Sequence, residues 1–555
     1  MPDDPQYQER LKKEFQLIEH FDFVGHILRV RQILDLAEGI PYLTRGSAGA
    51  SLICYLLKIS NIDPIRHNIP LARFMHYGRE DYPDIDIDFP SHLRDELYER
   101  IYQKWPGKFA RISNEVTHGT KSALREAIRE TGYRKAFSRF LTPEDILPFD
   151  EAMEVRRRAA ELEGEFKHYS LHCGGIVHFE KGVPKKLKIG ANQVGLTKDD
   201  VARLGLVKID LLCNRGLSQL MDIDPKLQPH QYPETDKATS KLFCEGDNIG
   251  LTFAESPTCR NAFLAIQPQN VYEVGLALAV VRPMAGGAHK SDVLQHWNKT
   301  RDVSQKLVYE DDAITLIQKE LNCDEEEADR YRKGYKREDF RITQEFENKC
   351  KNQHLIGQLR RLKKYGFCKA HAISYGRLVW ALAYQKAHNP KRFWQATLNN
   401  CNSYYRPWVH MREASAYWKI SPGRRPWYSD DSGNKLLSEN DKPKLFTAPE
   451  EEYLEKNWWS DPNFLSNMYQ KKGNQEIFFR GLIACGKEHW RGDRFVTYLT
   501  IGTDNGEYLD LYFSGRVNYE PYDWIMGSGI TYTSFNAKAV KVHAYRFGQV
   551  AEFYQ

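Results

Sequence analysis

Apolar residues recur at helical spacing through much of the chain. In residues 8–38 they lie three or four positions apart, which predicts amphipathic helices. The apolar run at 48–59 is long enough for a buried helix, and the basic stretch at 121–140 also suits a helix. From 239 to 399 the same spacing dominates, so this region is expected to be mostly helical.

Strand patterns are shorter and fewer. Residues 84–89 alternate Asp with Ile or Phe, and the runs 172–178 and 206–211 are rich in β-branched residues beside glycine, which predicts three strands. From 477 to 513 apolar and polar residues alternate between turn signals, as in a small β domain. A stretch rich in Pro, Ser, Asp and Lys at 421–443 separates it from the helices as a linker or exposed loop.

The composition limits the class of protein. A chain of 555 residues is long enough for several domains, and 41% hydrophobic with 28% charged residues is typical of a globular protein. No apolar run approaches the ~20 residues of a membrane-spanning helix, and the charged N-terminus has no signal-peptide core. The ten cysteines are scattered without a Cys-x-x-Cys pair, so we expect a cytoplasmic protein without a zinc ribbon or a disulfide framework.

The charge is unevenly distributed. The net charge is +5, but residues 330–392 hold 17 Lys and Arg against 4 Asp and Glu. A segment this basic predicts a polyanionic partner, although a solvated helical face is an alternative explanation. The candidate nucleic-acid contacts are Lys121 in the earlier basic stretch and, within this segment, Arg360, Arg361, Lys363 and Lys364.

The acidic strand is the first candidate for chemistry. Side chains alternate along a strand, so Asp84, Asp86 and Asp88 share one face and the apolar residues between them share the other. Like charges side by side destabilise a strand unless a cation lies among them, and Mg²⁺ prefers carboxylate oxygens. The alternative is an acidic edge strand that faces water.

A second strand carries a matching carboxylate. The same alternation places Lys208 and Asp210 together. A third carboxylate beside Asp86 and Asp88 would complete a two-metal site, in which one ion activates a hydroxyl and the other stabilises pyrophosphate. Lys208 could then steady the phosphates or the primer terminus; the alternative is a buried Lys–Asp pair.

Two further motifs suit a nucleotide. The Gly- and Ser-rich run that begins at Arg45 lets backbone amides approach a phosphate, although a turn that caps a helix would look the same. Lys369, His371 and Tyr375 offer a cation, a hydrogen-bonding ring and a stacking ring, which suits a triphosphate and a base. Packing of these rings in the core is the alternative.

These elements, in this order, resemble the alpha subunit of bacterial DNA polymerase III, the family C replicative polymerases, over about residues 10–400. The residues that carry the resemblance are Arg45-Gly-Ser-Ala with Tyr55-Leu-Leu-Lys-Ile, Pro83-Asp-Ile-Asp-Ile-Asp-Phe, Gly119-Thr120, His172-Cys-Gly-Gly-Ile-Val, Leu204-Gly-Leu-Val-Lys-Ile-Asp, Glu255-Ser256 with Arg260, Arg282-Pro283, and Tyr365-Gly-Phe with Lys369 and His371. Phe478-Phe-Arg-Gly-Leu-Ile-Ala and Leu509-Asp-Leu-Tyr-Phe-Ser are similar to the family's OB domain.

The resemblance implies roles for individual residues. Asp86, Asp88 and Asp210 would hold two Mg²⁺ ions, for which Mn²⁺ could substitute, and Lys208 would be an active-site lysine. The residues implied for nucleotide binding are Arg45, Gly46, Ser47, Arg73, Arg79, Arg282, Lys369, His371 and Tyr375.

The implied fold is an α+β multidomain protein with a polymerase-β-like nucleotidyltransferase palm, a helical thumb, helical fingers and a small C-terminal OB-like β-barrel. The expected boundaries are 1–116 and 172–216 for the palm, 117–171 for the thumb, 217–420 for the fingers, 421–470 for a linker and 471–555 for the barrel.

The chain also departs from the family pattern. It opens at the palm, so the family's PHP domain is not expected, and no helix-hairpin-helix segment, clear sliding-clamp motif or proofreading exonuclease is recognised. Met284-Ala285 follows Arg282-Pro283 where the family has Gly-Pro, and Cys368 stands where Asn is usual. These changes leave the metal site intact and affect nucleotide selection.

The expected function is a template-directed DNA polymerase of a phage, mobile element or bacterial cell, with primer–template DNA, dNTPs and accessory replication proteins as partners and no membrane association. Two other classes stay open. One is a catalytically idle relative that binds nucleic acid, and retention of Asp86, Asp88, Asp210 and Lys208 argues against it. The other is a template-independent nucleotidyltransferase, which the finger motifs disfavour.

Overall fold

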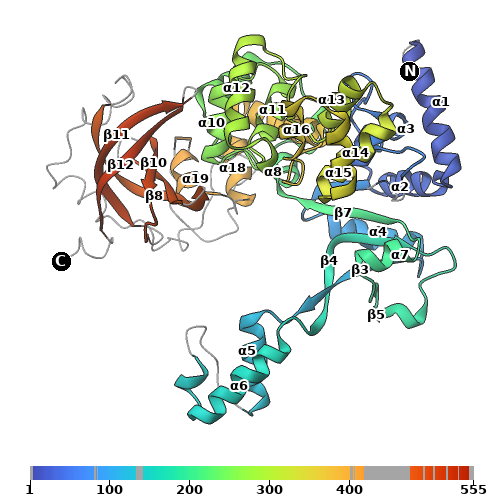
Figure 1. Cartoon of the computed structure of the whole chain (residues 1–555), viewed down its shortest axis with the longest axis horizontal. Coiled ribbons are helices and arrows are strands. Elements are labelled where there is room, and N and C mark those ends of the chain that lie inside the picture. The colour runs from blue at the N-terminus through green and yellow to red at the C-terminus, as the bar shows by residue number, and fades with distance from the viewer. Residues whose placement is uncertain are drawn as a thin grey trace.

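The computed structural model of the chain describes residues 4–79, 83, 85–132, 142–400, 404–405, 407–414, 416–417, 475–491, 494–503, 507–519, 523–534 and 537–548. It is a mixed α/β chain of several units that ends in a barrel (Figure 1). The predicted linker at 421–470 and Asp84 lie outside the described residues.

A mixed seven-stranded sheet forms the N-terminal unit, in the order β1-β2-β7-β4-β3-β6-β5. Its strands are β1 (Leu43–Gly46), β2 (Ile85–Pro90), β3 (Phe109–Thr117), β4 (Phe166–His178), β5 (Lys188–Gly190), β6 (Gln193–Val194) and β7 (Lys208–Asn214). β2 runs parallel to β7 and antiparallel to β1. The acidic strand is therefore internal to the sheet, which excludes the edge-strand alternative.

Helices cover the apolar face of this sheet. They are α1 (Pro5–His20), α2 (Val24–Leu36), α3 (Leu52–Leu56) and α4 (Arg94–Lys104), with short 3-10 turns η1 (Ser47–Ala50) and η2 (Leu71–Arg73). On the opposite face, α7 (Lys198–Arg203) packs through Val201 against Ala110 and Val177. Ile85, Ile87 and Phe89 of β2 are buried in a core with residues of α2 and α4. The helices predicted in 8–38 and the apolar face predicted for the acidic strand are thus confirmed.

An arm projects from the sheet. β3 and β4 continue beyond it as a two-stranded ribbon, and α5 (Thr120–Glu130) and α6 (Phe149–Leu162) lie at its tip, away from the rest of the chain (Figure 1). The strand predicted at 172–178 is only the second half of β4. The first half, residues 166–171, mixes polar and apolar residues that are mostly exposed in this ribbon, so it lacks the pattern of a core strand. The helix predicted at 121–140 ends at Glu130, where Gly132 takes a left-handed conformation (φ 83°); 133–141 lie outside the described residues.

The middle of the chain is helical, as predicted. Its helices are α8 (Arg215–Ile223), α9 (Lys237–Glu245), α10 (Pro257–Ile266), α11 (Val271–Val280), α12 (Ala288–Thr300), α13 (Asp312–Leu321), α14 (Glu325–Arg337), α15 (Phe340–Lys349), α16 (Gln353–Leu359), α17 (Lys369–His388), α18 (Pro390–Asn400) and α19 (Pro407–Ala414). α17 is buried along most of its length and packs against α9, α11 and β1, so it joins the helical region to the sheet. No described helix is both long and apolar enough to cross a bilayer.

The C-terminal strands form a closed five-stranded barrel in the order β10-β12-β11-β8-β9. They are β8 (Glu476–Arg491), β9 (Arg494–Gly502), β10 (Tyr508–Ser514), β11 (Trp524–Ser534) and β12 (Ala537–Gly548). Leu482, Ala484 and Cys485 of β8 belong to the same apolar core as α10 and α11, and Arg260 forms an ion pair with Asp510 (2.6 Å). The barrel, which is consistent with an OB-like domain, is therefore packed directly onto the helical region.

Candidate active site

A row of charged residues crosses the sheet. Pairing of β1, β2, β7 and β4 places Arg45 opposite Asp86, Asp86 opposite Asp210, and Asp210 opposite Gly175. Adjacent strands lie ~4.8 Å apart, so these side chains are neighbours on one face. The structure thus brings together two carboxylates that are 124 positions apart in sequence, with an arginine beside them.

Asp88 lies two residues after Asp86, on the same face of β2, and its side chain is buried. Its side chain accepts from Arg45 Nε (2.9 Å) at Oδ1, and from Asn214 Nδ2 (2.9 Å) and the Tyr375 hydroxyl (2.8 Å) at Oδ2. Asp88 is 1% exposed, so these donors replace water around the carboxylate. Burial and the Asp88 charge raise the pKa of the Tyr375 phenol well above its usual value, which keeps it a neutral donor.

Asp210 has one oxygen engaged and one without a partner. Lys208 Nζ donates to Oδ2, so the Lys–Asp pair considered from the sequence does form. Oδ1 is buried without a hydrogen-bond donor, and His172 Nδ1 stands 3.7 Å from it. That nitrogen accepts backbone N–H groups from Gly174 and Gly175, so it has no proton to give to Asp210. Burial lowers the pKa of His172 and favours the neutral ring.

The two glycines after His172 are required by close packing. A Cβ on Gly175 would stand 2.7 Å from Ile112 Cδ1 and 2.9 Å from His172 Nδ1. We expect Gly175→Ala to lower the free energy of unfolding by about 1–3 kcal/mol, because an overfilled site must shift its neighbours. Urea denaturation measures the change. Gly25→Ala, at a helical position with open space around it, is the control and should be neutral or stabilising; equal losses in both variants would contradict the packing argument.

The donor set fits a hard divalent cation. Carboxylate oxygens are the ligands that Mg²⁺ prefers, and the unpartnered Oδ1 of Asp210 lies across the strand boundary from Asp86. Within the described ranges, however, no three carboxylates, imidazoles or thiols already converge on one metal position. The three-carboxylate metal site predicted from the sequence is therefore not preformed among these residues, and Asp88 is instead bonded to protein donors.

The predicted phosphate loop and α17 lie side by side. A Cβ on Gly49 would stand 2.5 Å from Ala370 Cβ, and Ser374 Oγ donates to the Thr44 carbonyl (2.8 Å). Gly46 has a φ of 77°, which favours glycine, and Ser47 is buried beside it. Ser51 caps α3, so the capping role considered from the sequence is real for that residue.

Arg73 and Arg79 serve the fold. Arg73 Nε pairs with the buried Asp311 (2.9 Å), which also accepts the backbone N–H of Lys369 (2.6 Å). Arg79 donates to the carbonyls of Arg73 and Phe74. Their effect on a nucleotide is therefore expected to be indirect, through the position of Lys369 at the start of α17.

A stack of flat side chains leads to Asp88. The Arg282 guanidinium lies 4.1 Å over the Phe367 ring, Phe367 stacks on His371 (centroids 4.1 Å apart, 18°), and His371 meets Tyr375 edge-on at 4.6 Å. Burial and the positive charges of Arg45 and Arg282 lower the pKa of His371 to about 3. His371 is therefore a neutral ring at ordinary pH, and part of the core packing considered from the sequence is realised.

This depressed pKa has a consequence for stability. Below pH 6.5 the unfolded chain takes up a proton at His371 that the folded chain does not, so folding stability falls as the pH drops toward 3. We expect the loss in unfolding free energy between pH 7 and 5 to be about 2 kcal/mol smaller in His371→Gln than in the parent. Denaturant titrations at the two pH values measure it, and identical losses would refute a neutral His371.

Part of the positive charge of the basic segment is paired within the fold. Arg360 pairs with Glu347 (2.8 Å) and Lys363 with Glu338 (2.9 Å), while Arg361 donates to the carbonyls of Met284 and Gly286. Other ion pairs of this segment are Arg332–Asp329, Lys336–Glu310 and Lys386–Asp247. Lys364 is exposed, and Lys121 is exposed near the start of α5 on the arm. The excess of Lys and Arg over Asp and Glu in residues 330–392 is therefore weaker evidence for a polyanionic partner than the count alone indicates.

Asn214, which bonds Asp88, and Phe253, which packs on Tyr375, differ in how far the sequence could reveal them. Asn214 was not among the predicted residues, yet it is fully buried and bonds Asp88 while it caps α8 through its Oδ1. The signal was present, because Asn214 lies on the same face of β7 as Asp210 and is a preferred helix cap. Phe253, whose ring lies 5.0 Å from Tyr375, carries no such signal.

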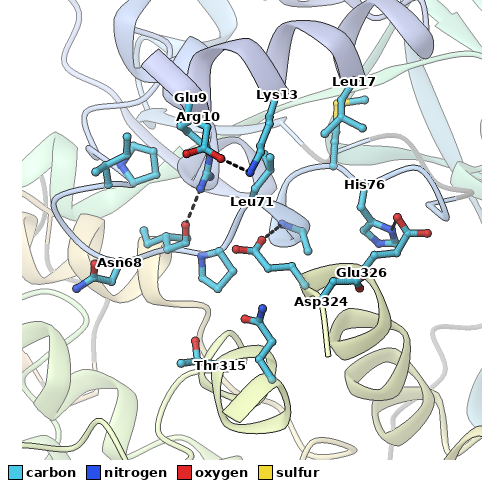
Figure 2. A pocket seen from close by; sticks show the side chains of 18 of the residues that line it. Glu9, Arg10, Lys13, Leu17, Asn68, Leu71, His76, Thr315, Asp324 and Glu326 are labelled. Carbon is cyan, nitrogen blue, oxygen red and sulfur yellow. Dashed lines mark hydrogen bonds and ion pairs between the residues drawn. The ribbon is translucent and has the colours of Figure 1, made fainter. Parts of the chain in front are cut away.

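A cavity of about 830 Å³ lies apart from the carboxylates, between α1, the loop around η2 and the start of α14 (Figure 2). Its charged groups are paired with one another: Lys13 with Glu9 (2.7 Å), and Glu325 with the backbone N–H of Ala72 (2.9 Å). None of the predicted site residues lines it. The candidate chemistry is therefore confined to the sheet and α17.

Comparison with known proteins matches this arrangement to one family. The model for the bacterial DNA polymerase III alpha NTPase domain matches residues 2–213, and that for the bacterial DNA polymerase III alpha subunit finger domain matches 215–355. The error-prone DNA polymerase of Cutibacterium acnes is 29% identical over 454 residues, which cover 72% of this chain and 40% of the relative.

Two further relatives agree. The DNA polymerase III subunit alpha of Halalkalibacterium halodurans is 26% identical over 70% of this chain and 40% of its own length. The error-prone DNA polymerase of Dechloromonas aromatica is 26% identical over 73% of this chain and 46% of its own length. The chain thus spans less than half the length of these relatives. With two adjoining models of one subunit matched across its sheet and helical region, the chain belongs to the bacterial DNA polymerase III alpha-subunit family.

Proposed function

We propose that the chain is a template-directed DNA polymerase that extends a primer 3′-hydroxyl with dNTPs and releases pyrophosphate. The observation that carries the proposal is the charged row on neighbouring strands, in which Asp86 and Asp210 lie opposite each other beside Asp88. Relatives named error-prone DNA polymerase and DNA polymerase III subunit alpha support the substrate class. No proofreading activity is included, because no motif of the chain supplies an exonuclease.

The carboxylates have a defined part in this reaction. Two Mg²⁺ ions (or Mn²⁺) held by Asp86, Asp88 and Asp210 would lower the pKa of the primer hydroxyl and stabilise the pyrophosphate as it leaves. Lys208 bonds Asp210, so it both orients that carboxylate and brings a positive charge toward the primer terminus. Asn214 and Tyr375 hold Asp88 from the protein side.

The nucleotide would lie between the β1 loop and α17. Arg45, Gly46 and Ser47 approach from one side, and Lys369 stands at the N-terminus of α17, where a helix favours an anion. Arg282, Phe367, His371 and Tyr375 form the flat stack beside them, which suits a base or sugar. Arg73 and Arg79 would act indirectly. Arg79 holds the chain at residues 73–74, and Arg73 pairs with Asp311, which fixes the backbone of Lys369.

We assign the family's parts to this chain as follows: palm 1–116 and 172–216, thumb 117–171, fingers 217–420, linker 421–470 and OB-like barrel 471–555. Support comes from the sheet that carries the carboxylates, the projecting arm with Lys121, and the helices packed on α17. Of the basic-segment candidates, exposed Lys364 suits phosphate contact best, while Arg360, Arg361 and Lys363 could contribute only by exchanging their present partners.

A groove at the barrel suits the template strand. A cavity of about 560 Å³ between α10, α12 and the barrel is lined by Lys290, Lys487, Tyr404 and Tyr498. Cations and aromatic rings together are typical of single-stranded nucleic-acid sites. Burial lowers the pKa of Lys290.

Primer extension tests the proposal. With Mg²⁺ and a hairpin primer–template, each dNTP supplied alone should be added only opposite its complement, and parallel reactions with NTPs report sugar selectivity. Addition that ignores the template would favour a template-independent transferase, and no addition with any nucleotide would favour an idle relative. The proposed setting is the cytoplasm of a bacterium or a phage-infected bacterium, with accessory replication proteins as partners.

A further inference from the structure

Asp88 is surrounded by donors that come from three separate elements. Arg45 reaches it from β1, Asn214 from the end of β7 and Tyr375 from α17. A carboxylate offers about four acceptor positions, and three of them are taken here. The remaining position is on Oδ1, the oxygen that already accepts from the Arg45 guanidinium. Any cation that approaches Asp88 therefore meets a fixed positive charge at the same oxygen.

Arg45 also faces the second carboxylate of the row. Its Cα is the cross-strand partner of Asp86, and its guanidinium pairs with Asp88 (2.9 Å). A guanidinium cannot be deprotonated in a protein, so this positive charge is permanent. A guanidinium and a divalent ion at the same carboxylate oxygen repel each other, and burial of the site reduces the screening of this repulsion by water.

The charge balance of the whole site leads to the same conclusion. Asp86, Asp88 and Asp210 contribute −3, and Arg45 and Lys208 contribute +2. Two divalent ions would leave the site strongly positive, whereas a bound triphosphate restores the balance. Arginine binds phosphate oxygens in a bidentate manner and is therefore drawn to them. Arg45 directly precedes Gly46 and Ser47, the loop proposed to hold the phosphates.

We propose that Arg45 competes with the metal ion for Asp88, and that the incoming triphosphate relieves this competition by drawing the guanidinium away. The inference rests on the proposed function, since it presumes the carboxylate site. Asn214 and Tyr375 are neutral, so they keep Asp88 oriented without opposing a cation. The device links metal loading to the presence of nucleotide, and it accounts for the absence of a preformed three-ligand cluster among the described residues.

Mn²⁺ binding without nucleotide or DNA tests the competition, with free Mn²⁺ measured by electron paramagnetic resonance. We expect Arg45→Gln to bind Mn²⁺ about tenfold or more tightly than the parent, and Arg45→Lys to lie between them. Arg31→Gln makes the same chemical change on α2, where the arginine pairs with the exposed Asp35, and it should change Mn²⁺ affinity less than threefold. Adding Asp88→Asn to Arg45→Gln should abolish the gain.

A second experiment uses an exchange-inert rhodium(III) complex of a dNTP. The rhodium stays on the triphosphate and takes one of the two metal positions, so Mn²⁺ binding reports the other position. The complex should tighten Mn²⁺ binding to the parent and have no further effect on Arg45→Gln. Equal Mn²⁺ affinity in parent and Arg45→Gln, or a gain that survives Asp88→Asn, would overturn the competition. Mn²⁺ binding that is insensitive to Asp86, Asp88 and Asp210 substitutions would instead overturn the metal site of the proposed function.

Discussion

Asp88→Asn should lower primer extension by at least about a thousandfold, which corresponds to about 4 kcal/mol of transition-state stabilisation. The substitution keeps the size of the side chain but removes a negative charge that is 1% exposed and faces Asp86 along the strand. It also turns an NH₂ group toward at least one of the donors that now reach Asp88. Steady-state and single-turnover extension on a templated hairpin measure the effect.

Asp35→Asn is the matched control for that loss. It makes the same chemical change on α2, where the carboxylate is 61% exposed and pairs with Arg31 on the surface. Its extension rate should equal that of the parent. Duplex binding and thermal unfolding of Asp88→Asn separate a chemical defect from misfolding. An Asp88→Asn variant that folds, binds DNA and extends the primer at the parent rate would contradict the catalytic role of Asp88.

Asp311→Asn should lower the free energy of unfolding by about 3 kcal/mol, because removal of one partner from a buried ion pair leaves the other charge uncompensated. Asp311 is 2% exposed, its pair with Arg73 joins η2 to α13, and its second oxygen accepts the N–H of Lys369. Asn can still accept that N–H, so the variant isolates the loss of charge. Urea unfolding followed by circular dichroism measures it.

The contrasting variant is Glu338→Gln, which breaks the exposed pair with Lys363. Exposed pairs contribute ~0–1 kcal/mol, so its effect should be below about 0.5 kcal/mol. Equal stability losses in the two variants would refute the special role of the buried pair.

The basic segment illustrates how far composition can be trusted. Its excess of positive charge was counted over a continuous stretch of sequence, but the carboxylates that neutralise Arg332, Lys336 and Lys386 come from residues 329, 310 and 247. Ion pairs form between residues that are close in space, so a count along the chain cannot include partners outside the stretch. The ribbon of β3 and β4 in the arm was missed for a different reason. Most of its side chains are exposed, so its sequence does not alternate between buried and exposed positions as a core strand does.

The sequence by itself determined the local features of this protein. The two-residue period showed that Asp86 and Asp88 share a face and that their apolar neighbours are buried, and helical spacing located α1, α2 and most of the middle of the chain. Only the tertiary structure decided which strands pair, and so placed Asp210 beside Asp86. It also decided that Asp88 is bound by Arg45, Asn214 and Tyr375. Periodicity is a property of neighbouring residues, whereas strand register and hydrogen-bond partners depend on contacts between segments that here are 43 to 287 residues apart.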